Sequence, residues 1–282
     1  MHLVLLMLVV SALLAGTTLL AKLLGDGPGG LGLHPLQISA GRFFFAWLAI
    51  LAFSAIQSPT IAEANWRFHF ARAICGWGSA TCLFAAATVL PLASANALSF
   101  LSPLVTMVCS ILFLGERVGL WRWSAAAIAM MGALVLTAPG SDTFQPAALI
   151  AIAAALFMGV ESIFIKRLSD SEPPVRILLI NNSIGVVLSV TAAVFVWEWP
   201  DARGWVFLAA LGFTMICAQT LFIQAMKRGE ASLVVPLFYT ILVFAALFDL
   251  AIFGIIPTWQ AVGGAALIVI GAVVISVRGR DR

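Results

Sequence analysis

The chain has 282 residues, of which 62% are hydrophobic and only 10% are charged, and its formal net charge is +3. Soluble domains are closer to half apolar and a quarter charged, so this composition excludes an ordinary water-soluble domain. In lipid the backbone polar groups must be paired within the protein, and long continuous apolar runs predict helices rather than a β-barrel.

The first apolar run, Leu3 to Ala21, is long enough to cross a membrane. It has no basic segment before it, and it continues to Lys22 without a small-residue cleavage site, so we interpret it as a retained span rather than a secretion signal. Three further charge-free runs predict one span each: Phe43 to Ala62, Ile177 to Trp197 and Gly204 to Met226.

Two apolar runs are too long for a single crossing. Ala73 to Gly115 carries no charge and predicts two spans joined by a tight turn at Thr88 to Pro91. Ala231 to Val277 is interrupted only by Asp249 and predicts a second pair, with its turn at Gly254 to Pro257. Adding Trp123 to Thr137 and Ala147 to Lys166 brings the predicted number of spans to ten.

The positions of Lys and Arg predict the orientation of these spans. With both termini on one side, twelve of the fifteen basic residues fall on that side, which we call the arginine-rich face. The other three, Lys22, Arg42 and Arg203, fall on the opposite, arginine-poor face. The positive-inside rule therefore predicts that both termini are cytoplasmic.

An internal repeat accompanies this count. A shift of 138 residues places Ala93-Ser94 on Ala231-Ser232, Phe100 on Phe238 and Trp121 on Trp259. A unit of five spans crosses the membrane an odd number of times, so two copies in tandem must have opposite orientations. We therefore expect an all-α membrane protein of ten transmembrane helices in two inverted five-helix repeats, residues 1–139 and 140–282, with a substrate site between them.

The motifs of the fourth span resemble a known family. Ala93 to Ala97, Leu101-Ser102-Pro103-Leu104, Leu114 to Arg117 and Gly132 are similar to the EamA module of the drug/metabolite transporter superfamily. The second half resembles another copy, but Phe253-Gly254-Ile255 stands where Gly115-Glu116 stands in the first.

The resemblance implies ten helices, alternating access and export of a metabolite across the inner membrane of a bacterium. Length and aromatic content are most similar to amino-acid exporters of the YddG type, so the expected function is export of aromatic or other neutral amino acids. The alternative is a carrier of the same mechanism for a purine, a vitamin or a cationic drug. A membrane-embedded enzyme is a third hypothesis, but the three histidines are scattered and no HExxH or GxSxG pattern occurs.

Residues near mid-span are the candidates for the cavity, because polar groups and helix breaks within a bilayer often serve transport. The candidate substrate-binding residues are Trp77, Gly78, Thr81, Asn96, Ser99, Pro103, Phe157, Glu161, Gln219, Pro236 and Tyr239.

Several of these residues have specific expected roles. Trp77 offers an aromatic face to an ammonium group, and the Tyr239 hydroxyl needs a partner, either a substrate carboxylate or Gln219. Glu161 either meets a substrate amine or a proton, or pairs with Lys166 or Lys227. Arg42 and Asp249 have similar depths in the membrane and are expected to form a structural ion pair.

We expect no cofactor, no metal and no nucleic-acid partner. The expected partners are a small-molecule substrate and the lipid bilayer, and a monomer is favoured over a dimer. Ala125, Ala129 and Gly132 in the fifth span are suited to close helix packing, as are Ala261 and Ala265 in the tenth. The four cysteines are expected to be free thiols.

Overall fold

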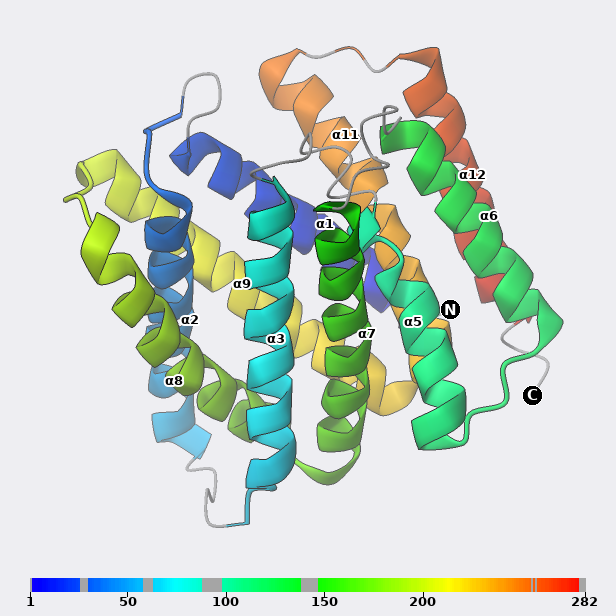
Figure 1. Cartoon of the computed structure of the whole chain (residues 1–282), viewed down its shortest axis with the longest axis horizontal. Coiled ribbons are helices and arrows are strands. Elements are labelled where there is room, and N and C mark those ends of the chain that lie inside the picture. Colours follow the sequence, from blue (N-terminus) through cyan, green and yellow to red (C-terminus); the bar gives the residue numbers. More distant parts are fainter. Residues whose placement is uncertain are drawn as a thin grey trace.

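The computed structural model describes residues 2–25, 30–57, 63–87, 98–137, 147–254, 256 and 258–278, in which the regular structure is entirely helical (Figure 1). The elements in chain order are α1 (His2–Leu24), α2 (Pro35–Gln57), α3 (Trp66–Ala87), α5 (Ser102–Cys109), the π-helical turn η1 (Ser110–Leu114), α6 (Leu120–Thr137), α7 (Ala147–Ser171), α8 (Pro174–Ala193), the 3₁₀ turn η3 (Val194–Val196), α9 (Ala202–Arg228), α10 (Ala231–Val234), the 3₁₀ turn η4 (Val235–Tyr239), α11 (Thr240–Phe253) and α12 (Trp259–Arg278).

These elements form the ten predicted spans, so the all-α fold is confirmed. Seven stretches are long and apolar enough to cross a membrane, and two shorter apolar helices cover Ser102–Leu114 and Trp259–Val274. The one remaining span, third in chain order, is α3, which carries Arg67, His69 and Arg72 in its first two turns. The fourth span consists of α5 and η1, and the ninth consists of α10, η4 and α11. The predicted turn at residues 88–91 lies outside the described residues.

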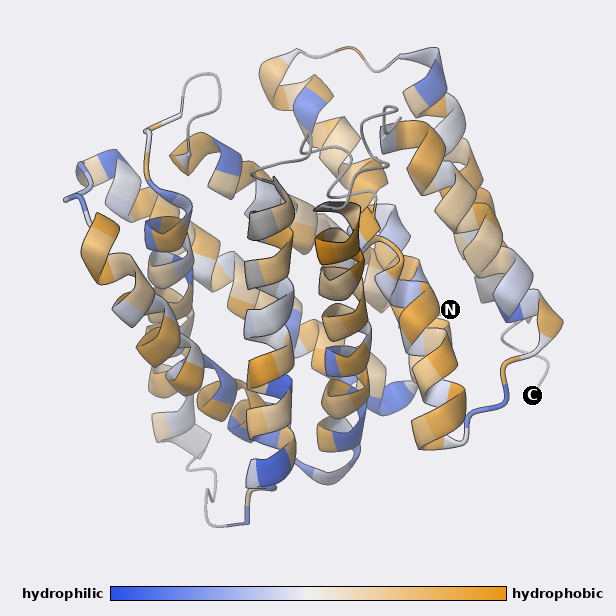
Figure 2. Cartoon of the chain, viewed as in Figure 1, coloured by the Kyte–Doolittle hydropathy of each residue, from blue (hydrophilic) through white to orange (hydrophobic). Residues whose placement is uncertain are grey.

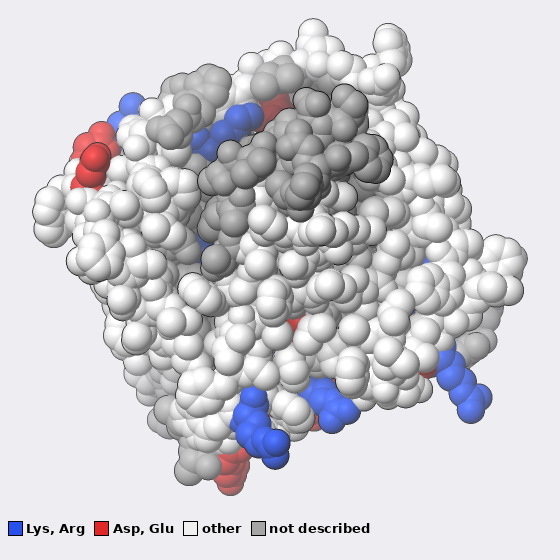
Figure 3. Space-filling model, viewed as in Figure 1, with Lys and Arg blue, Asp and Glu red and all other residues white. Residues whose placement is uncertain are grey.

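The outer surface has the polarity that a bilayer requires. Large apolar side chains such as Ile74, Leu112 and Phe213 are more than half exposed. Apolar residues run along the helices, and the hydrophilic ones gather toward the helix ends (Figure 2). In the space-filling view the middle of the molecule is almost free of charge, and most charged groups lie at its upper and lower margins (Figure 3). This uncharged band is suited to the hydrocarbon core.

Helix packing joins the two halves closely. The most extensive contacts pair a helix of spans one to five with a helix of spans six to ten: α6 with α12, α3 with α7, α1 with α9, α2 with α8, and α2 with α9. If each helix is replaced by its counterpart in the other half, the α3–α7 contact becomes the α1–α9 contact. The α6–α12 and α2–α8 contacts are unchanged by this replacement. The fold is therefore a single interleaved bundle with approximate internal symmetry.

The closest helix approach is between α6 and α12. A Cβ atom added to Gly264 would lie 2.6 Å from the backbone oxygen of Gly132 and 2.6 Å from the backbone nitrogen of Leu136. Gly271 packs almost as closely, since an added Cβ would lie 2.8 Å from the backbone oxygen of Ala125 and 2.9 Å from Cβ of Ala129. The small residues of α6 thus make the predicted close contact within the chain, and Gly264 and Gly271 contribute to it from α12.

The adjacent glycines 263 and 264 provide a matched test of this contact. Gly264→Ala places a methyl group against backbone atoms, which cannot move as a side chain can, and should lower the free energy of unfolding by about 1–3 kcal/mol. Gly263→Ala adds the same methyl group where no atom lies within 4 Å, so it should not destabilise the protein and should raise the free energy of unfolding by up to about 1 kcal/mol, because alanine has the higher helix propensity. Denaturant unfolding in detergent measures both, and equal effects would contradict the packing described.

Candidate functional site

A cavity of about 370 Å³ lies among α2, α3, α7, α8 and α9. Its wall includes Leu36 at the start of α2, Leu83 late in α3 and Ala192 at the end of α8, which all lie toward the arginine-poor face. Its deepest residues, such as Ala73, come from nearer the arginine-rich ends of their helices. The cavity thus extends from mid-membrane to one face, with walls contributed by both halves of the chain.

Three of the predicted substrate-binding residues line this cavity: Trp77, Glu161 and Gln219. The side-chain oxygen Oε1 of Gln219 is buried and accepts no hydrogen bond from the described residues. Asn181 also lines the cavity and was not among the predicted residues. Its position inside the apolar run Ile177 to Trp197 is the same signal that selected Gln219.

The other candidates do not line the cavity. Gly78 packs against the ring of Phe157 on α7, where an added Cβ would lie 3.4 Å from ring carbons. The remaining buried candidates lie on the fourth and ninth spans, none of whose described residues lines the cavity: Ser99, Pro103, Pro236 and Tyr239. Asn96 and the side chain of Thr81 lie outside the described residues.

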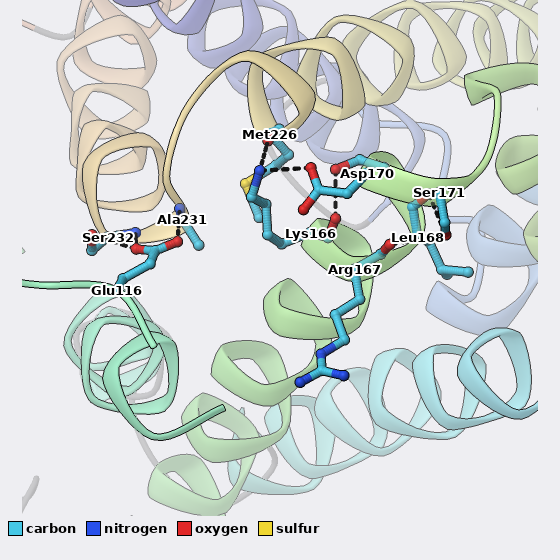
Figure 4. A network of polar contacts seen from close by, with 10 residues as sticks. Glu116, Lys166, Arg167, Leu168, Asp170, Ser171, Met226, Ala231 and Ser232 are labelled. Atoms are coloured by element: carbon cyan, nitrogen blue, oxygen red, sulfur yellow. Dashed lines mark hydrogen bonds and ion pairs between the residues drawn. The ribbon is translucent and has the colours of Figure 1, made fainter. Parts of the chain in front are cut away.

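Three ionisable groups meet at the deep end of the cavity. Glu161 and Arg42 both line it, and Arg72 lies behind Glu161 with its Nε atom 3.7 Å from Oε1 of that carboxylate. The Arg72 side chain is only 3% exposed. Glu161 therefore pairs with Arg72, and not with Lys166 or Lys227. Lys166 instead donates to Asp170 and to the carbonyl of Met226 (Figure 4).

The predicted ion pair of Arg42 with Asp249 is wrong. Asp249 accepts a hydrogen bond from Lys22 Nζ at 2.8 Å, which ties the end of α1 to α11. Arg42 instead lies with its guanidinium carbon 4.1 Å from the centre of the Phe43 ring. Similar depth in the membrane was the basis of the prediction, but depth does not determine on which side of a helix a residue projects.

A buried ionic cluster lies between the cavity and the arginine-rich face. Glu172, at the α7–α8 junction, accepts from the backbone N–H of Asn65 at 2.7 Å and lies 3.0 Å from Nε2 of His69. Arg176 lies 4.0 Å from the same carboxylate and 3.5 Å from Glu63. These contacts hold the start of α3 against the start of α8, and they close the cavity at this face.

Spans four and nine are interrupted near their prolines, and the interruptions meet. Residues 100 and 101 form a turn before α5, and Pro236 lies in the 3₁₀ turn η4. The Tyr239 hydroxyl donates to the Phe100 carbonyl at 2.7 Å. Its partner is thus a backbone carbonyl of span four, and neither Gln219 nor a substrate. Tyr239 is fully buried and packs against α6.

Glu116 makes a second contact between these two spans. Its carboxylate follows Gly115, whose φ of +68° turns the chain sharply out of η1. The two carboxylate oxygens accept from the backbone N–H of Ala231 at 2.7 Å and of Ser232 at 3.0 Å, so Glu116 caps the start of α10 (Figure 4). Glu116 thus satisfies orphan N–H groups of a helix that is distant in the sequence.

Ten packed spans with a one-sided cavity between two interleaved halves define a membrane transporter. The chain belongs to the EamA-like transporter family, whose model matches residues 2–138 and again residues 145–277. The predicted family and the two repeats of the fold are thereby confirmed.

Several characterised proteins are similar to the chain. The S-adenosylmethionine uptake transporter of Rickettsia bellii is 24% identical over 85% of this chain and 83% of its own length. The riboflavin transporter of Vibrio cholerae is 30% identical over 69% of this chain and 65% of its own length. The pseudopaline exporter CntI of Pseudomonas aeruginosa is 25% identical over 69% of each. A crystal structure of another protein matches the fold with a TM-score of 0.82 over 99% of this chain and 96% of that one, at 22% identity.

Removal of the Tyr239 hydroxyl tests its assignment as a structural group. Tyr239→Phe leaves the Phe100 carbonyl without its partner and should lower the free energy of unfolding by about 1–3 kcal/mol. Transport affinity should not change. Thr191→Val is the control, because the Thr191 hydroxyl is exposed and bonds only within its own helix. A loss of affinity in a stable Tyr239→Phe protein would contradict the assignment.

Glu116→Gln tests the contact between spans four and nine. The amide keeps one acceptor oxygen where the carboxylate has two, so one of the two capped N–H groups loses its partner. The free energy of unfolding should fall by about 0.5–2 kcal/mol. Arg117→Gln changes the exposed neighbour and should have no such effect. Equal stability of Glu116→Gln and wild type would show that the cap does not hold in solution.

Proposed function

We propose that the chain moves a small organic metabolite across the membrane through this cavity by alternating access. The observation that carries the proposal is the one-sided cavity itself. Its lining residues run from mid-membrane to the arginine-poor ends of α2, α3 and α8, and the cluster around Glu172 lies between the cavity and the other face. A channel would need a continuous path, whereas a carrier needs a site that one face reaches at a time.

The departure of the packing from internal symmetry supports this mechanism. Exchanging the halves maps the α2–α9 contact onto the α3–α8 contact, yet α2 packs along α9 while α3 and α8 touch only locally. If the two contacts exchanged, with α3 closing on α8 and α2 parting from α9, the cavity would open to the opposite face. Breaking the Glu172 contacts would be part of that exchange.

The cavity supports a solute other than a plain amino acid. Its volume of about 370 Å³ lies in the range of roughly 300–1,000 Å³ typical of pockets that hold drug-sized ligands. The relatives are named for S-adenosylmethionine, riboflavin and pseudopaline, each larger than one amino acid. We therefore favour a metabolite that combines a ring or other apolar body with polar ends.

Export of an aromatic or other neutral amino acid is the second candidate. Arg42 and Glu161 in one cavity match the two charges of a zwitterion, and Trp77 offers an apolar face beside them.

The distribution of basic residues favours a cytoplasmic arginine-rich face in a bacterial inner membrane, so the described conformation would receive its solute from outside. The relatives include both uptake transporters and an exporter, so the direction of net transport is part of the test.

Transport by purified protein in liposomes tests the function. Uptake and release of labelled S-adenosylmethionine, riboflavin and phenylalanine should be compared with protein-free vesicles. Gln219→Leu is the cavity variant, because it removes a buried acceptor that no described group satisfies and should therefore not destabilise the protein. We expect at least one solute to move faster than background and its flux to fall several-fold in Gln219→Leu.

Gly263→Ala, on an open surface of α12, is the matched control and should transport at the wild-type rate. Movement of phenylalanine alone would favour the amino-acid candidate. Flux that is equal in Gln219→Leu and wild type would show that the solute does not pass through this cavity.

A further inference from the structure

Arg42 is a cation of the cavity wall that no carboxylate of the described residues contacts directly. It lines the cavity wall, and no carboxylate of the described residues forms an ion pair with its guanidinium. Its neighbour is the Phe43 ring, over which the guanidinium lies at 4.1 Å. A ring attracts a cation through its quadrupole, but it does not neutralise the charge. Charged groups within a membrane are costly and in most cases serve function.

The acid of the cavity does not supply this charge. Glu161 is the one acid among the described residues of the cavity wall, and it is matched by Arg72. Arg72 is almost completely buried behind it and has no other carboxylate within reach among the described residues. Glu161 attracts both guanidinium groups but contacts only that of Arg72. Two guanidinium groups and one carboxylate leave a surplus of one positive charge, and Arg42 is the guanidinium that lines the cavity.

The position of Arg42 depends on a contact between the two halves of the chain. A Cβ atom added to Gly185 of α8 would collide with the Phe43 ring, so only glycine at this position lets the ring pack where it does. The ring in turn supports the guanidinium from one side. A cation that lines the cavity and is held in place by packing is preorganised for a ligand.

A second unsatisfied group lines the same cavity. Gln219 Oε1 is buried and accepts no hydrogen bond from the described residues. A buried acceptor without a donor is unfavourable unless a ligand provides one. The cavity thus presents a cation that no carboxylate contacts and an acceptor that no described donor satisfies.

We infer that Arg42 binds an anionic group of the transported solute, a carboxylate or a phosphate, while Gln219 Oε1 accepts an N–H or O–H of the same molecule. The inference rests on the proposed function and narrows its substrate class to metabolites that carry such an anion. Guanidinium binds both anions through paired hydrogen bonds, so the geometry defines the shared chemistry and the experiment distinguishes the two.

Matched probe pairs that differ in the anionic group provide the test. The carboxylate pairs are S-adenosylmethionine with its decarboxylated form and phenylalanine with phenethylamine. The phosphate pair is riboflavin 5′-phosphate with riboflavin. Equilibrium binding to the purified full-length protein in nanodiscs should favour the anionic member of at least one pair by roughly tenfold or more. The pair that shows the preference identifies the anion.

Variants at Arg42 assign that preference to the residue. Arg42→Gln should abolish the difference within the pair, and Arg42→Lys should retain part of it, because the charge stays but the paired donors are lost. Arg203→Gln removes an exposed cation of α9 near the same face and should leave the preference unchanged. Arg42 has no ion pair to lose, so its variants should fold, which a size-exclusion profile checks.

A second measurement does not depend on finding the solute. Benzoate and phenyl phosphate, added at constant ionic strength, should raise the unfolding temperature of the wild type, and Arg42→Gln should lose the increase. Equal binding of both members of every pair, a preference that persists in Arg42→Gln, or stabilisation by neither anion would overturn the inference. In the first two cases transport through the cavity could still be measured, so the proposed function would stand. Failure of transport by folded protein would count against that function instead.

Discussion

Hydrocarbon offers no partner for a hydrogen bond, and this constraint accounts for both the regular and the irregular parts of the fold. Where a span is continuous, its backbone groups pair within the helix. Where spans four and nine are interrupted, the chain supplies partners from elsewhere: Tyr239 donates to the Phe100 carbonyl, and Glu116 accepts from the first N–H groups of α10. The two interruptions thus satisfy each other, and they join the two halves away from the cavity.

The same constraint explains the arrangement of the charges. Toward the arginine-rich face, Glu172 has a backbone donor and a histidine beside it, and Arg72 is paired with Glu161. The cluster around Glu172 lies between the cavity and this face. In the cavity no carboxylate of the described residues contacts Arg42, and Gln219 Oε1 accepts no hydrogen bond from them, so these are the groups that a solute can complete.

Interleaving of the halves gives the carrier a means to move. Most helices pack against a helix of the other half, and the α6–α12 contact brings two backbones together through Gly132 and Gly264. Contacts that are unchanged when the halves are exchanged, such as α6–α12, can persist whether the cavity opens to one membrane face or to the other. The α2–α9 and α3–α8 contacts map onto each other and differ in extent, so they are the ones that can exchange. In the proposed mechanism the internal repeat would provide two equivalent closed arrangements from one set of residues.

The sequence by itself determined the number of spans, the five-span repeat and the family, because long apolar runs in lipid leave the backbone little choice but the helix. It also selected Trp77, Glu161 and Gln219 from their depth along each span. The tertiary structure alone decided which face of each helix meets the cavity. In the structure the Tyr239 hydroxyl makes a structural hydrogen bond, Asp249 pairs with Lys22, and Arg42 lies over the Phe43 ring with no carboxylate in contact. The depth of a residue in the membrane follows from counting residues along one helix. The direction in which its side chain points depends on how the ten helices are rotated against one another. Helix rotation is set by packing contacts such as Gly185 with Phe43, which join residues far apart in the chain.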